Sequence, residues 1–69
     1  MARYEFGMVF WSPTHDKGTV NLPGAAETSY RGGSEKIVEV LSDLGHQGWD
    51  VATCATGGRW VIWTVRREL

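Results

Sequence analysis

The chain has one cysteine, Cys54, and two prolines among its 69 residues. One cysteine excludes an intramolecular disulfide and is consistent with a reducing compartment. No apolar run approaches the roughly 18 residues that a membrane-spanning helix needs. Charged residues at positions 3 and 5 interrupt the apolar stretch that a secretory signal would require. These absences predict a cytoplasmic protein without a membrane partner.

An excess of charge of one sign is also missing. Seven Lys and Arg against eight Asp and Glu give a formal net charge of -1, which offers no overall attraction to long nucleic acid. The length allows a single domain, residues 1–69, and such small domains are marginally stable without a disulfide, a metal or partner subunits. Aromatic residues are plentiful at 12%, with four tryptophans. The chain therefore has more large apolar side chains than a small interior can cover.

The N-terminal segment, residues 3–11, has an apolar residue at every second position. This period predicts a strand with one strongly apolar face, which consists of Tyr4, Phe6, Met8 and Phe10. Val9 and Trp11 make the opposite face apolar as well toward the end of the strand. Pro13 ends the strand because proline cannot donate a ladder hydrogen bond.

Two further strands are predicted at residues 49–55 and 60–67, joined by a hairpin turn at Thr56-Gly57-Gly58-Arg59. Both faces of the 60–67 strand are apolar, which predicts that it is buried on both sides in the centre of a sheet. Cys54, in the middle of the 49–55 strand beside small residues, is expected to be buried.

Residues 12–33 contain both prolines and four of the nine glycines, and few apolar side chains. This composition predicts mainly a long loop. Structureless loops of this length are uncommon in compact domains. The segment therefore either holds a short strand near Thr19–Leu22, with a small hairpin at the Asp16-Lys17-Gly18 turn signal, or acts as a lid.

From Ser34 the apolar period changes to that of a helix, with apolar residues at i, i+3, i+4 and i+7: Ile37, Val40, Leu41 and Leu44. The pattern predicts an amphipathic helix with Ser34 as its N-cap. Glycine favours helix ends, so the helix is expected to terminate at Gly48.

The element order predicts an α+β fold, with one helix on one face of a three-stranded antiparallel-type sheet, or four strands if residues 12–33 add one. The helix links the first two strands, and the third fills the gap between them, which gives the order 1-3-2. The uncovered face is expected to keep Val9, Trp11 and either Trp60 or Trp63. Such a patch predicts a homo-oligomer, most simply a two-fold dimer. The alternative is that residues 12–33 fold over that face.

One segment resembles a known family: Leu41-Ser-Asp-Leu44-Gly45-His-Gln-Gly48-Trp49-Asp50-Val51, after an opening Tyr-Glu-Phe strand and before a hairpin that ends in Arg-Arg. It is similar to short bacterial and phage domains of unknown function that carry Leu-Asn-x-Leu-Gly-x-x-Gly-Trp-Glu-Leu-Val. The resemblance covers the first strand and residues 34–67. It implies a small helix-on-sheet fold, and no catalytic residues come with it.

Few residues suggest catalysis or metal binding: His15, Asp16, His46 and Cys54. Zinc ligands occur as two closely spaced pairs, whereas the two histidines here are isolated and the cysteine is single. No metal site, cofactor or catalytic residue is therefore predicted. An enzyme that uses His15, Asp16 or Cys54 is the third choice among the functions considered.

Arginine beside tryptophan can hold a planar anion, because the ring stacks on the planar part and the guanidinium binds the charge. Arg59, Arg66 and Arg67 flank the strand that contains Trp60 and Trp63, and Arg31 precedes a helix start. The chain is therefore predicted to be a non-enzymatic oligomeric binding module for a small planar anionic, nucleotide-like ligand held between subunits. The candidate binding residues are Trp11, His15, Lys17, Arg31, Arg59, Trp60 and Trp63. The alternative is a structural or protein-interaction subunit that uses its aromatic sheet face.

Overall fold

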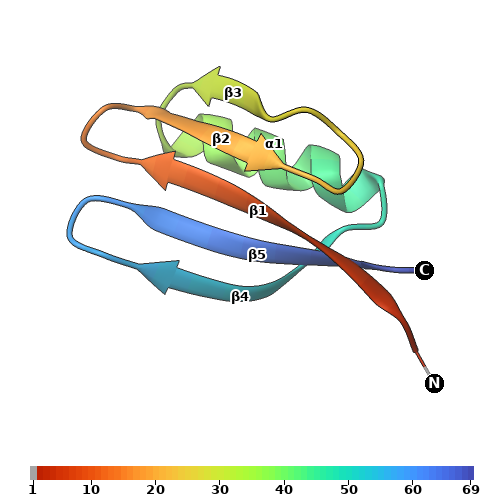
Figure 1. Ribbon diagram of the computed structural model, residues 1–69. Coiled ribbons are helices and arrows are strands. Elements are labelled where there is room, and N and C mark those ends of the chain that lie inside the picture. Colours follow the sequence, from red (N-terminus) through yellow and green to blue (C-terminus); the bar gives the residue numbers. More distant parts are fainter. Residues whose placement is uncertain (1) are drawn as a thin grey trace.

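The computed structural model describes residues 2–69, which form one helix packed on one antiparallel sheet (Figure 1). The strands, in chain order, are β1 (Tyr4–Ser12), β2 (Lys17–Asn21), β3 (Thr28–Arg31), β4 (Asp50–Thr56) and β5 (Val61–Glu68). The helix α1 (Ser34–His46) follows β3. The described residues give a five-stranded sheet in the order β3-β2-β1-β5-β4. The predicted α+β class with one helix is confirmed.

The predicted size of the sheet is wrong. The three strands that the sequence predicted are β1, β4 and β5, and they lie in the expected antiparallel order β1-β5-β4. Residues 12–33, expected to be mainly loop, form β2 and β3 and add them beside β1. The alternative of a short strand near Thr19–Leu22 is confirmed by β2, whereas β3 was not predicted. Both prolines of that segment, Pro13 and Pro23, fall in turns between strands, so they do not interrupt the ladders.

The helix presents Ile37 and Leu44 to the interior. Its N-cap is Gly33 rather than Ser34, and no side chain makes a capping hydrogen bond. At the other end Gly48 adopts a φ of 91°, and the Trp49 amide donates to the Leu44 carbonyl at 3.0 Å. This is a Schellman arrangement, in which a glycine with positive φ closes the helix, so the predicted termination at Gly48 is confirmed.

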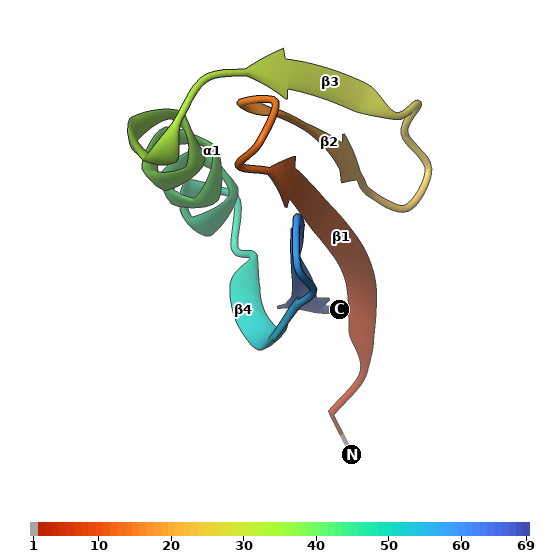
Figure 2. The same ribbon diagram turned by 90° about the vertical axis from the view of Figure 1, so that its left-hand side faces the viewer.

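The core lies between α1 and the inner face of the sheet, which curves around one side of the helix (Figure 2). Its buried residues are Val9, Leu44, Trp49 and Val65. The prediction that Val9 and Trp11 lie on the uncovered face is therefore wrong, because Val9 is fully buried on the inner face. Two glycines explain the choice of face. A Cβ on Gly7 would lie 2.7 Å from Leu22 Cδ2, and one on Gly18 would collide with Tyr30, so Leu22 and Tyr30 can pack on this face because both positions lack a side chain.

The opposite side of the sheet, called here the open face, carries the alternate residues of β1. Tyr4, Phe6 and Met8 are 39%, 57% and 45% exposed. The sequence predicted that the helix would cover this row, and it does not. A monomeric domain with such a row leaves an apolar patch in contact with water.

The alternative, that residues 12–33 fold over the face that holds Val9 and Trp11, is correct in part. Three side chains of this segment, Val20, Leu22 and Tyr30, pack against the core on that face, which α1 also covers. The segment leaves the open face uncovered, extends the sheet edgewise and shelters one indole on the inner face. There, Trp11 Nε1 donates to the Gly32 carbonyl at 3.3 Å. The Trp11 ring also stacks with Trp63 at a centroid distance of 6.5 Å.

Strand β4 is exposed at all seven positions. The predicted burial of Cys54 is wrong, because β4 is an edge strand that the helix does not cover. A register shift between Val51 and Thr53 leaves Ala52 as an extra residue. Such a bulge changes which side chains share a face, so Cys54 lies with Val51 and not with Ala52.

Within residues 2–69, no helix has the length and apolar character needed to cross a lipid bilayer.

Candidate functional site

A hollow of about 510 Å³ lies over strands β1, β2 and β3. Its lining residues are Phe10, Lys17, Gly18, Thr19, Ser29, Tyr30 and Arg31. Phe10 pairs with Thr19, which pairs with Ser29, so these three side chains form one row across the open face. The hollow therefore combines an aromatic ring with two hydroxyl groups.

Two cations border this row. Lys17 and Arg31 are directly opposite each other in the β2–β3 ladder, and neither takes part in an ion pair among residues 2–69. Like charges directly opposite in a sheet are destabilising. A bound anion would relieve this repulsion, and Arg31 could bind a phosphate or carboxylate through two parallel hydrogen bonds.

Tyr30 supports the hollow from the inner side of the sheet. Its ring lies against Gly18, and its hydroxyl donates to the Phe10 carbonyl at 2.6 Å. Burial raises the pKa of Tyr30 to about 12. The phenol therefore stays protonated and keeps donating in alkaline solution as well as at neutral pH, which fixes β3 relative to β1 under the hollow.

Of the seven candidate binding residues, only Lys17 and Arg31 line the hollow. Trp11 and Trp63 are half-buried and stack on the inner face, so they cannot supply walls on the open face. His15 is exposed in the β1–β2 turn, where its amide donates to the Ser12 carbonyl at 3.2 Å.

Arg59 and Trp60 lie in the turn between β4 and β5, and neither lines the hollow. The Trp60 ring occupies the space where Gly57 would carry a Cβ, and the Gly57 amide donates to the Trp60 carbonyl at 2.9 Å. This ring therefore packs on its own turn, although 38% of the residue is exposed.

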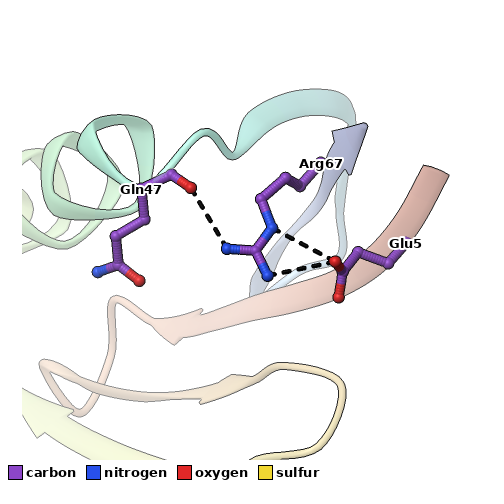
Figure 3. A network of polar contacts seen from close by, with 3 residues as sticks. All are labelled: Glu5, Gln47 and Arg67. Carbon is purple, nitrogen blue, oxygen red and sulfur yellow. Dashed lines mark hydrogen bonds and ion pairs between the residues drawn. The ribbon is translucent and has the colours of Figure 1, made fainter. Parts of the chain in front are cut away.

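Arg67, which the sequence analysis considered as a ligand contact, is used within the fold (Figure 3). Its Nη2 lies 3.2 Å from Glu5 Oε2, and its Nη1 donates to the Gln47 carbonyl at 3.3 Å. The guanidinium also lies over the Trp49 ring, 4.6 Å from the centroid. Arg67 thus joins β1, β5 and the end of α1.

Arg66 is similarly occupied. It lies over the Tyr4 ring at 4.7 Å and forms an ion pair with Asp50 at 3.4 Å. The two arginines at the end of β5 therefore have aromatic and acidic partners inside the chain, unlike the Lys17–Arg31 pair.

Sequence reasoning missed Phe10, Thr19 and Ser29. The alternation in residues 3–11 placed Phe10 correctly with Met8, but assigned that row to the helix side. Thr19 and Ser29 belong to the segment that was expected to be mainly loop. The signal that could have found them is a pair of short runs on either side of Pro23 that contain β-branched or aromatic residues, Thr19-Val20 and Thr28-Ser29-Tyr30.

No group of three or more His, Cys, Asp or Glu side chains in the described part of the chain could hold a metal ion. His15 and Asp16 are exposed in the β1–β2 turn, His46 is exposed at the end of α1, and Cys54 is exposed on β4.

No protein-family model matches the chain, and no curated protein or solved structure does either. The resemblance carried by residues 41–51 stays a prediction. What the chain does must therefore be argued from its own geometry.

Proposed function

We propose that this chain is a non-enzymatic, self-associating binding module that holds a small planar anion in the hollow over β1, β2 and β3. The observation that carries the proposal is the Lys17–Arg31 pair, two opposed cations without an acidic partner among residues 2–69, beside the Phe10 ring. A nucleotide-like ligand matches this set, since its base can lie on the ring while its phosphate meets the cations.

The hydroxyl groups of Thr19 and Ser29 share a cross-strand row with Phe10, and the two cations form the next row. A hydroxyl group can donate to a phosphate oxygen, and it can donate to or accept from a sugar hydroxyl. The sequence predicted a site between subunits. The site proposed here is built on β1, β2 and β3, and self-association is a separate part of the proposal.

The test compares three probes by thermal shift and calorimetry: a nucleoside monophosphate, the same nucleoside without phosphate, and inorganic phosphate. The monophosphate should raise Tm because ligand binding to the folded state stabilises it. The nucleoside and the inorganic phosphate, which each supply half of the recognition, should raise it less.

Two variants, Lys17→Ser and Arg31→Ser, should each weaken binding of the monophosphate by roughly tenfold, the effect expected for one charge-assisted contact. Arg3→Ser is the matched control, because Arg3 is an exposed cation outside the hollow. No shift with the monophosphate, or equal loss in all three variants, would contradict the proposal.

A protein-interaction role is the second candidate, favoured by the exposed row of Tyr4, Phe6 and Met8. This row borders a smaller hollow of about 310 Å³, which Phe6, Met8 and Leu22 help to line. If none of the three probes binds, this apolar part of the open face becomes the better candidate site.

A further inference from the structure

The two edges of the sheet differ in how well they are protected. Edge strands present unpaired N–H and C=O groups, and proteins protect them by shortness, charge or proline. Strand β3, at one edge, has four residues and ends in Arg31. Strand β4, at the other edge, has seven residues, Asp50 as its sole charge, and no proline. The protections of β4 are therefore limited to one charge at its first residue, Asp50, and the bulge at Ala52.

The surroundings of β4 leave its outer edge free. In Figure 1, α1 lies behind β2 and β3, and β4 forms the opposite margin of the sheet. The whole chain exposes 4736 Å². A folded monomer of this mass exposes about 4,300 Å². The chain by itself therefore leaves more surface in water than is usual for its mass, and β4, exposed at every position, contributes to that surface.

The charges at the two ends of β4 favour one arrangement of that partner. Asp50 opens the strand; it pairs with Arg66 at 3.4 Å but keeps 67% of its side chain exposed. Arg59 lies in the turn that follows β4. An antiparallel pair of identical strands places the start of one beside the end of the other, so Asp50 of one copy comes next to the Arg59 turn of the second copy. A parallel pair would place Asp50 beside Asp50. The edge is therefore complementary to itself about a two-fold axis.

We propose that β4 pairs antiparallel with β4 of a second copy, so that one continuous sheet runs through both chains. The main-chain hydrogen bonds supply the attraction, as in other cases of strand addition to a free edge. This inference rests on the self-associating part of the proposed function and specifies its surface. It is independent of the ligand, because β1, β2 and β3 line the hollow.

The first experiment measures the mass of the intact chain in solution by light scattering and sedimentation. The wild type should have twice the monomer mass of 7.7 kDa. Thr53→Lys should halve it, since Thr53 lies mid-strand and lysines brought together across the axis repel. Thr28→Lys on β3 is the matched control at the other edge and should leave the dimer intact.

Phe6→Lys tests the open face as a competing interface, and it too should leave the dimer intact. A monomeric wild type, a dimeric Thr53→Lys variant, or a dimer that only Phe6→Lys disrupts would each overturn the proposal. Nucleotide binding is measured separately, so a monomer that still binds the monophosphate overturns this inference and leaves the ligand site standing.

If Thr53→Lys does not fold, amide hydrogen exchange on the wild type decides. Amides of β4 should exchange more slowly as the protein concentration rises, while those of β3 stay unchanged. Exchange in β4 that does not depend on concentration would overturn the proposal.

Discussion

The two faces of the sheet both carry apolar side chains, but they differ sharply in how far those side chains are buried. On β1, Val9 is fully buried under α1, whereas its neighbour Met8 is 45% exposed. The inner face carries two glycines, Gly7 and Gly18, which let Leu22 and Tyr30 pack close to the backbone. The open face carries the ring, the cations and the hydroxyls of the hollow. Stability therefore resides mainly on one face, and the capacity to bind on the other.

The largest test of this comparison uses the helix. Leu44→Ala should lower the free energy of unfolding by about 2–5 kcal/mol, because it removes a buried side chain and leaves a cavity. Val38→Ala, on the exposed side of the same helix, should change it by less than about 0.5 kcal/mol. Urea unfolding measures both, and equal losses would show that α1 is not held by its inner face.

The second test overfills the inner face. A side chain at Gly18 meets the Phe10 carbonyl and the Tyr30 ring, so Gly18→Val should lower the unfolding free energy by about 3 kcal/mol. Gly58→Ala is the control, since nothing lies within 4 Å of its added Cβ. If the two variants unfold at the same urea concentration, the close contact between β2 and β3 is not rigid.

The third test concerns Tyr30. Tyr30→Phe removes the hydrogen bond to the Phe10 carbonyl and should lower the unfolding free energy by about 1 kcal/mol at neutral pH. Burial raises the pKa of Tyr30 from 10.0 to about 12, so the unfolded chain loses this proton first. Stability is then fully present below pH 10 and falls as the pH rises toward 12. The fall measured by urea unfolding should be smaller in Tyr30→Phe, and identical pH profiles would contradict the assignment.

The smallest expected effect lies on the open face and has the opposite sign. Lys17→Thr removes a like charge opposite Arg31, so it should raise the unfolding free energy of the ligand-free protein by about 0.2–1 kcal/mol. The same variant should weaken binding of the nucleoside monophosphate. If it lowers stability instead, Lys17 makes a favourable contact and the repulsion argument fails.

The helix was the most predictable element. Its apolar period placed Ile37 and Leu44 inward, and Gly48 ends it through backbone geometry that glycine favours. These are local signals. By contrast, β1 has apolar residues on both faces, so its alternation could not determine which face the helix covers. That choice depends on the packing of Leu22 against Gly7 and of Tyr30 against Gly18. These residues are distant in the sequence, so a local pattern does not reveal their contact.

The candidate site was predictable only in part for a similar reason. Lys17 and Arg31 were both named from the sequence, but separately, as part of a loop and as part of a helix start. The register of β2 and β3 places them opposite each other. The glycines and prolines of this segment indicated mainly a loop, so the pairing of the two strands and its register were not predicted. Phe10 was assigned to the covered face, so the aromatic part of the site was predicted to come from the tryptophans.

The stacked pair of Trp11 and Trp63 offers an optical reporter that the protein already contains. Two indoles 6.5 Å apart couple their electronic transitions, which produces a paired positive and negative signal in circular dichroism. Because the pair bridges β1 and β5 on the inner face, the signal should report whether these central strands remain joined. Titrations at the hollow could then be followed with a spectroscopic check on the fold, without any added dye.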